Sequence, residues 1–175
     1  MPTKPSPRKN SARAFALSLS IQRGAHVGEL PVSRTQLRRW VAAALDADAA
    51  LTLRFVDAHE GRMLNAAYRH RDYATNVLTF CYDDVGDGVL RADIVLCLPV
   101  LRREAREQGK TLRDHLAHLV MHGVLHAGGH DHETPAEAQQ MEAEEVRRLA
   151  RFRIADPYRD APAGSLRKPS PARYR

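Results

Sequence analysis

The segment HGVLHAGGHDH, residues 122–132, determines how the central part of this chain must fold. Residues four apart lie on one face of an α-helix, so the spacing of His122 and His126 predicts a helix that presents two imidazoles to one ion. We expect the Gly-Gly pair at 128–129 to take positive φ and turn the chain, so that His132 returns as a third ligand. Three protein ligands with one open position are typical of a catalytic zinc site.

The predicted helix has an apolar stripe with histidines along its edge. At 100° per residue, six residues fall on one arc: Leu116, Leu119, Val120, Gly123, Val124 and Ala127. Four histidines fall on the adjacent arc: His115, His118, His122 and His126. Imidazoles at this edge would line a cleft, although for the first two of them a solvated helix face is the alternative.

Outward from this helix, strand-like and helix-like patterns alternate. Period-two or continuous apolar runs predict four strands, at 15–22, 51–57, 77–82 and 93–98. Helical periodicity and capping residues predict five helices. Four of them begin after Ser33, at Pro99, after Thr111 and after Thr134, and a short one runs through Met63 and Tyr68. We therefore predict an α+β fold, a single domain with a roughly four-stranded mixed sheet packed by about five helices.

The formal net charge of +6 is concentrated at the two ends of the chain. Residues 1–13 carry four Lys or Arg and no acid, and residues 156–175 carry five Lys or Arg and two Asp. Seven of the ten prolines also lie there, so we predict a disordered basic arm at 1–13, a folded domain at 14–155 and a flexible basic tail at 156–175. Such ends either attract phosphates at low salt or simply solubilise the chain.

Cysteine usage and hydropathy indicate the compartment. Cys81 and Cys97 lie far apart, each in an apolar run, which predicts buried thiols in a reducing environment. No stretch approaches the roughly 18–20 apolar residues that a membrane helix requires. We expect a soluble cytoplasmic protein with no membrane partner, and an organellar address on the acid-poor N-terminus is the alternative.

The histidine spacing also resembles that of metzincin metalloproteases, which have His at relative positions 0, 4 and 10 and Gly at 7. Those enzymes need a glutamate directly after the first His as general base, and this chain has Gly123 there. Glu133 and Asp131 are close in sequence, but neither occupies the required position. Hydrolysis of another substrate, such as a peptide, stays an alternative that this glycine disfavours.

Together with stretches further upstream, the segment is similar to the zinc signature of the YbeY family of ribosomal-RNA maturation endoribonucleases, which has the form H-G-x-L-H-x-x-G-Y-D-H. LNAAYRHRDYATNVLTF, residues 64–80, resembles the family's N-x-x-Y-R-x-x-D-x-x-T-D/N-V-L-S-F stretch. ADIVLC from Ala92 resembles its G-D-I strand, and DPY from Asp156 resembles the end of its last helical region. The resemblance covers about residues 64–158.

The resemblance implies His122, His126 and His132 as ligands of one Zn²⁺ per chain. Five positions differ from the residues common in the family without removing a ligand: Ala74, Cys81, Ala92, Ala127 and His130. The last of these offers a competing imidazole, but His132 keeps the expected spacing. Asp131 is a candidate to orient a ligand imidazole, or else it caps the turn. Nickel or cobalt would fit the same imidazoles.

The resemblance also implies Arg69 as the catalytic residue, whose guanidinium would contact the phosphate as negative charge develops. An ordinary surface ion pair with Asp72 is the alternative. Tyr68 and Tyr73 flank this arginine and either stack on bases or pack against the protein. Three neighbouring polar residues either position RNA or hold a loop: Asn65, Thr75 and Asn76.

The function that follows is a single-strand-specific, zinc-dependent endoribonuclease acting in ribosomal RNA maturation and ribosome biogenesis. Zinc with three neutral imidazoles keeps its double charge and lowers the pKa of a bound water toward about 7, so that this water or an RNA 2′-hydroxyl can attack the phosphodiester. The expected partners are a ribosomal RNA precursor and proteins of the small ribosomal subunit, and no DNA is expected. A further alternative is a ribosome-associated RNA-binding factor with a structural zinc.

Overall fold

The computed structural model describes residues 14–130, 132–159 and 172–173 of the chain. In these ranges it contains five helices and one five-stranded sheet with strand order β1-β2-β4-β3-β5. The elements follow one another as β1 (Leu17–Arg23), α1 (Arg34–Ala44), β2 (Ala49–Val56), α2 (Ala58–Arg69), β3 (Val77–Cys81), β4 (Leu90–Cys97), α3 (Leu98–Glu107), α4 (Leu112–Ala127), α5 (Pro135–Ala150) and β5 (Ala172–Arg173). The predicted α+β class is confirmed.

The sheet is mixed, as predicted. β1, β2 and β4 run parallel, and β3 runs antiparallel to β4. The two-residue β5, which comes from the region predicted to be the tail, pairs in parallel with β3. β4 begins at Leu90, three residues earlier than predicted, because its first residues pair with the start of β2 although they do not form an apolar run.

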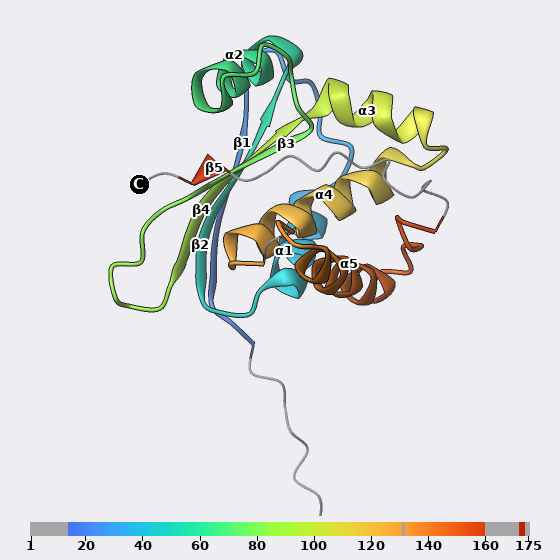
Figure 1. Ribbon diagram of the computed structural model, residues 1–175. Coiled ribbons are helices and arrows are strands. Elements are labelled where there is room, and N and C mark those ends of the chain that lie inside the picture. The colour runs from blue at the N-terminus through green and yellow to red at the C-terminus, as the bar shows by residue number, and fades with distance from the viewer. Residues whose placement is uncertain (1–13, 131, 160–171, 174–175) are drawn as a thin grey trace, which may run out of the picture.

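The helices cover the sheet on both faces, with α1, α4 and α5 on one face and α2 on the other (Figure 1). The larger hydrophobic core joins the sheet to α1 and α4 and includes Trp40, Leu53, Ile94 and Leu116, all fully buried. A smaller core on the opposite face is built from Val56, Leu78, Phe80, Val95, Cys97 and Val100, with Leu64 of α2 packed against it. α4, which carries the histidine segment, is therefore a central helix of the larger core.

The helix starts follow local capping signals. The side-chain oxygen of Ser33 accepts a hydrogen bond from the Gln36 backbone N–H, and that of Thr111 accepts one from the Asp114 N–H, both at 3.1 Å. Thr134 forms a reciprocal capping box at the start of α5. These bonds satisfy backbone donors that the first helical turn leaves without partners, which is why the starts of α1, α4 and α5 could be predicted from sequence.

α4 ends in a turn that reverses the chain toward the helix. The Gly129 N–H donates to the His126 carbonyl, and the His130 N–H donates to the Leu125 carbonyl, both at 3.0 Å. This is a Schellman arrangement, in which a single residue takes the left-handed conformation. Gly129 does so with φ of 94°, whereas Gly128 has φ of −74°. The expectation of positive φ was therefore wrong for Gly128, because that residue caps the helix and its N–H still donates to the Val124 carbonyl at 2.9 Å.

Among the described residues, no helix combines the length and apolar character needed to cross a bilayer. Both cysteines lie within the described part of the chain, and they form no disulfide. Cys97 is buried in the smaller core and Cys81 is half-buried at the end of β3.

Candidate metal centre

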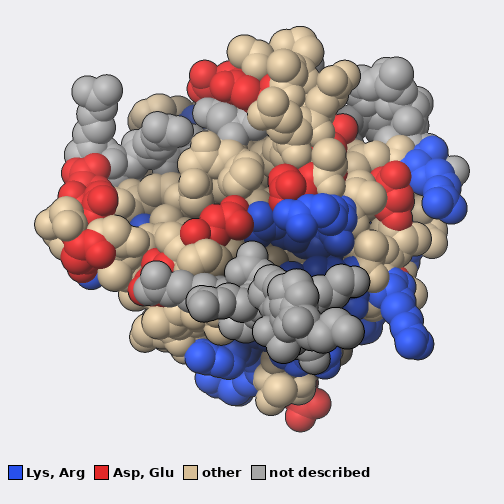
Figure 2. Space-filling view, turned by 90° about the horizontal axis from the view of Figure 1, so that it is seen from below, with Lys and Arg blue, Asp and Glu red and all other residues tan. Residues whose placement is uncertain are grey.

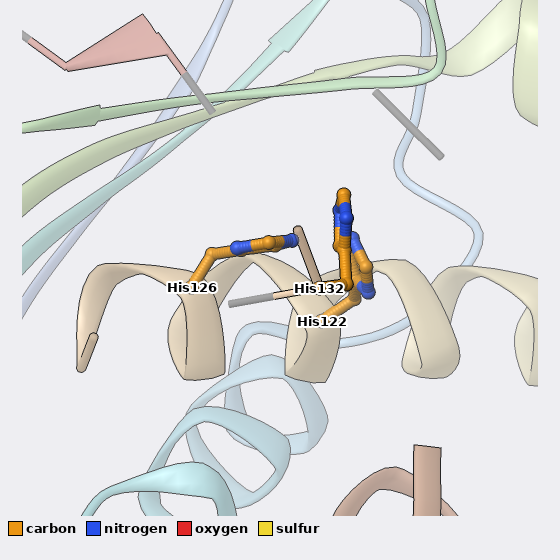
Figure 3. A group of neighbouring side chains, drawn as sticks. All are labelled: His122, His126 and His132. Atoms are coloured by element: carbon orange, nitrogen blue, oxygen red, sulfur yellow. The ribbon is translucent and has the colours of Figure 1, made fainter. Parts of the chain in front are cut away.

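The structure brings the three predicted histidine ligands together. His122 and His126 project from α4, His132 follows the turn, and each offers a nitrogen within 4.8 Å of the others. The ring centroids are 4.4 Å apart for His122 and His126 and 4.7 Å apart for His126 and His132. The rings of His122 and His132 stand side by side, and that of His126 points toward them (Figure 3).

Close packing of α4 on the sheet fixes the position of the first two histidines, which are only 5% and 6% exposed. A Cβ at Gly123 would lie 2.8 Å from Ile94 Cγ2 and 3.4 Å from Thr79 Oγ1, closer to Ile94 than carbon atoms normally approach. Position 123 therefore faces β3 and β4. Packing requires the glycine, and a protease-type glutamate would have no room there.

The donor chemistry fits a single divalent ion. Neutral imidazoles are common ligands of zinc, nickel and cobalt, and three of them leave a position for water or substrate. The described residues contain a second group with metal-ligand geometry, His118, His122 and Glu145, which shares one histidine with the first. In that second group the carboxylate is already engaged in hydrogen bonds, so the three-histidine group is the better candidate.

Glu145 is a candidate site residue that the sequence patterns did not identify. It belongs to α5 and is completely buried. Its Oε1 lies 2.5 Å from His122 Nδ1, and its Oε2 lies 3.3 Å from His118 Nε2. The hydroxyl of Tyr158 also donates to Oε2. One buried carboxylate thus joins a predicted metal ligand to two further side chains.

The environment keeps this carboxyl group ionised. Burial by itself raises the pKa of Glu145, but hydrogen bonds and charge interactions with His118 and His122 outweigh burial and hold the pKa well below the usual range. For Tyr158, burial and the neighbouring Glu145 charge both raise the pKa of the phenol. The phenol therefore stays protonated at neutral pH and can donate to the carboxylate.

A sequence signal for Glu145 existed. It lies one helical turn from both Met141 and Leu149, which are fully buried. A carboxylate in the buried stripe of a helix needs partners, because an uncompensated buried charge is costly. Those partners lie 23 and 27 residues earlier in the chain, where only the fold could identify them.

His115 and His118 are not a solvated face, so that alternative was wrong. They are 3% and 8% exposed. His115 Nε2 lies 2.8 Å from a carboxylate oxygen of Glu104 on α3, and the His118 ring packs edge-on against Tyr158 with centroids 5.4 Å apart. The histidine row on α4 therefore faces acidic and aromatic groups of α3, α5 and the segment after α5.

His130, two residues before His132, has a carboxylate partner of its own. His130 Nε2 lies 3.3 Å from a carboxylate oxygen of Asp46, which also binds Arg148 at 2.9 Å. His130, the possible competitor of His132, is thus engaged with the loop that follows α1. Asp131, the predicted orienting residue, lies outside the described residues.

Arg69 is the last residue of α2 and is half-buried. The alternative ion pair with Asp72 was wrong, because Asp72 binds Arg62 through two hydrogen bonds of 2.7 and 2.8 Å. Within the described ranges, no hydrogen bond connects Arg69 to the three histidines. The catalytic role predicted for Arg69 therefore stays a prediction.

The polar residues near Arg69 hold the loop that follows α2. Asn65 donates to the Tyr73 carbonyl at 2.7 Å, and Asn76 accepts from the Val77 N–H at 2.7 Å. The amide of Asn76 also donates to Glu104 at 3.1 Å. Because Glu104 also contacts His115, these two contacts connect the loop to α4. The loop-holding interpretation is confirmed for these two asparagines.

The two tyrosines beside Arg69 differ in their contacts. Tyr68 packs edge-on against Phe80 with ring centroids 4.9 Å apart, yet it is 41% exposed. Tyr73 is 54% exposed. Packing is thus established for Tyr68, and both rings keep an accessible part.

The face drawn in Figure 2, which is the underside of the view in Figure 1, carries charges of both signs. Figure 2 shows Lys and Arg in separate groups with Asp and Glu between them. On α5, Arg147 and Arg148 both contact Glu144.

The fold and the site together define a class of protein, a single α+β domain with three converging imidazoles on and beside its central helix. The family model described as Endoribonuclease YbeY matches residues 26–153. The chain therefore belongs to the endoribonuclease YbeY family.

Similar proteins of the same name share about half of their residues with this chain. The protein named Endoribonuclease YbeY from Herminiimonas arsenicoxydans is 54% identical over 151 residues, which cover 83% of this chain and 97% of the relative. That from Thiobacillus denitrificans is 52% identical over 142 residues, with 81% and 96% covered. That from Cupriavidus pinatubonensis is 56% identical over 148 residues, with 83% and 73% covered.

A solved structure supports the architecture. The solution structure of TM1509 from Thermotoga maritima matches with a TM-score of 0.51 and 25% identity. The match covers 85% of this chain and 99% of the other chain.

Proposed function

We propose that this protein is a metal-dependent endoribonuclease that cleaves single-stranded RNA in ribosomal RNA maturation. The observation that carries this proposal is the convergence of three buried or half-buried imidazoles in a member of the endoribonuclease YbeY family. Membership in a family of endoribonucleases supports RNA cleavage as the reaction, and the three histidines support a bound metal ion. Gly123, pressed against β4, disfavours the peptidase alternative.

His122, His126 and His132 would hold one ion, with Zn²⁺ expected from the ligand type. When bound, the ion would polarise a phosphodiester oxygen and activate the attacking water or 2′-hydroxyl. The protein's own contribution is to orient the imidazoles: α4 packing fixes the first two, and the turn at Gly129 directs the third.

Arg69 would contact the phosphate oxygens of the RNA. Its guanidinium stays charged at all relevant pH values and can donate two parallel N–H bonds to a phosphate. This role is supported by the pairing of Asp72 with Arg62, which argues against the surface ion-pair alternative for Arg69, and by the anchored loop that follows Arg69. The charge would matter most as negative charge builds up on the phosphate.

The proposed cleavage of RNA determines which partners we expect for this protein. We propose a ribosomal RNA precursor as substrate, proteins of the small ribosomal subunit as neighbours, the cytoplasm as location and no action on DNA. The basic residues near both ends of the sequence would add attraction to phosphates that weakens with salt and does not depend on base sequence.

Cleavage of labelled single-stranded RNA by untagged, zinc-loaded protein tests the proposal, with duplex RNA and single-stranded DNA of the same sequence as comparison substrates. We expect cleavage of the single-stranded RNA alone and a loss of at least about 100-fold in His126→Ala, because the ion loses a ligand. His26→Ala, which changes an exposed histidine of a turn, is the matched control and should cut normally.

Arg69→Gln should lower the cleavage rate by at least about 10-fold at unchanged zinc content, since it removes charge stabilisation and no ligand. Arg106→Gln on the exposed side of α3 is its control. Normal cleavage by a folded His126→Ala variant would overturn the proposal. If wild type never cuts RNA and His122→Ala unfolds, the zinc is structural and the RNA-binding alternative is correct.

A further inference from the structure

We propose that Glu145, held in place by Tyr158, is the positioning residue for the metal ligand His122 and sets which ring nitrogen of that histidine faces the ion. This inference deepens the proposed function and rests on its assignment of His122 as a ligand. It concerns a carboxylate on α5 and a tyrosine beyond the predicted end of the domain.

Three side chains contact the two carboxylate oxygens of Glu145. Oε1 lies 2.5 Å from His122 Nδ1, and Oε2 faces both His118 Nε2 at 3.3 Å and the Tyr158 hydroxyl. A carboxylate has about four lone-pair positions and no proton to donate when ionised. Each of these three neighbours must therefore be the donor in its bond.

This requirement selects one tautomer of His122. If Nδ1 donates to Glu145, the proton of the neutral ring resides on Nδ1, and the lone pair of Nε2 is available to an ion. Carboxylates that bind the second nitrogen of a metal-ligating histidine commonly fix its orientation and raise its basicity. Here the carboxylate is completely buried, so water cannot take over that role.

Hydrogen bonds also fix Tyr158, which contacts the carboxylate oxygen of Glu145 that does not face His122. Its N–H donates to Asp156 Oδ1 at 2.8 Å, and Lys110 donates to the neighbouring Pro157 carbonyl at 2.8 Å. Its hydroxyl lies 3.1 Å from His118 Nε2 as well as against Glu145. The segment at 156–159, which we predicted to begin the flexible tail, thus contributes a side chain to the site.

The neighbouring acid, Glu144, offers a matched control. It is on the same helix, but its side chain is 29% exposed and binds Arg147 and Arg148 instead of histidines. If any carboxylate on α5 supported the site through helix stability or general charge, both acids would matter equally. If Glu145 acts through His122, only Glu145 will matter.

Zinc affinity, measured without RNA by competition with a chromogenic chelator, tests the inference. A glutamine at 145 can turn either its oxygen or its NH₂ toward His122, so it no longer selects one tautomer. We expect Glu145→Gln to weaken zinc binding by about 10- to 100-fold, and Glu144→Gln to change it less than about 2-fold. Nitrogen-15 NMR of His122 should show a single Nδ1–H tautomer in wild type and mixed tautomers in Glu145→Gln.

Equal zinc affinity in Glu145→Gln and wild type, or an equal loss in Glu144→Gln, would overturn the inference. If Glu145→Gln does not fold, Tyr158→Phe decides, because it keeps the ring against His118 and removes only the hydroxyl. A loss of about 3-fold or more in zinc affinity supports the inference, since one charge-assisted hydrogen bond is removed, and unchanged affinity overturns it.

The outcome is separate from that of the proposed function. If Glu145→Gln weakens zinc binding as expected while wild-type protein cuts no RNA, the positioning role stands and the nuclease assignment fails. If the protein cuts RNA and zinc affinity is insensitive to Glu145, the nuclease assignment stands and the positioning role fails.

Discussion

Replacing Gly123 with alanine tests how tightly α4 must pack on the sheet to present its histidines. The added methyl would lie 2.8 Å from Ile94 Cγ2, well inside the 3.5–4.0 Å at which carbon atoms attract one another. Ile94 is fully buried on the central strand β4, and its β-branched side chain has little rotamer freedom. Relief therefore requires α4 to move away from the strand.

Two opposing effects determine the magnitude. Alanine is favoured over glycine inside a helix by about 1 kcal/mol. Overpacking a well-packed core costs about 1–3 kcal/mol. We expect packing to outweigh helix propensity, so that Gly123→Ala lowers the free energy of unfolding by up to about 2 kcal/mol and the Tm by up to about 6 °C. The displaced helix should also bind zinc less tightly.

Urea and thermal unfolding of the metal-free protein measure the effect, and a double-mutant cycle with Ile94→Ala identifies its cause. Ile94→Ala alone should cost about 2–5 kcal/mol because it leaves a cavity. The methyl at 123 fills part of that space, so the double variant should be destabilised by at least about 1 kcal/mol less than the sum. Strict additivity, or a Gly123→Ala variant more stable than wild type, would refute the packing argument.

Three further predictions address the turn, a surface carboxylate and a buried thiol. Gly129→Ala forces a side chain into φ of 94° and should destabilise the protein by about 1–2 kcal/mol and weaken zinc binding, whereas Gly128→Ala at φ of −74° should be nearly neutral by thermal unfolding and chelator competition; equal effects would contradict the Schellman assignment. The side-chain hydrogen bond from Arg91 is the main cause that lowers the pKa of Asp87 to about 2. Because this pKa is depressed, the associated stability is present above the unfolded pKa of about 3.9 and is lost as pH falls through about 2. Carbon-13 NMR titration should place the Asp87 midpoint near 2 and shift it upward in Arg91→Gln, and an unchanged midpoint would exclude the hydrogen bond as the cause. Burial raises the pKa of the Cys97 thiol, which is 2% exposed, so it should react with a disulfide reagent far more slowly than the chain's other thiol, and equally fast reaction would argue against its placement in the smaller core.

Features that depend on neighbours in sequence could be predicted from the sequence. The caps at Ser33, Thr111 and Thr134 are each formed within three residues, and the alternation in β2 follows from one face of a strand being buried. The approach of His132 to α4 likewise follows from a turn of a few residues. These elements and their order required no knowledge of distant contacts.

Features that depend on distant contacts could not. Glu145 is a ligand-orienting candidate only because α5 lies beside α4, and Tyr158 belongs to the site only because the chain after α5 returns to His118. Asp131 was the candidate for the orienting role, with capping of the turn as the alternative, because it lies next to the motif in sequence, and it lies outside the described residues. The start of β4 was misplaced for a related reason, since pairing with β2 extends the strand past its apolar run.

The metal content of the protein purified without an affinity tag tests the central claim most directly. After zinc loading and removal of excess metal, elemental analysis should find about one zinc per chain in wild type, as a site with three histidine ligands predicts, and far less in His126→Ala. Wild-type protein that retains no metal after loading, or a His126→Ala variant that retains a full equivalent, would contradict the assignment of the three histidines as the metal centre.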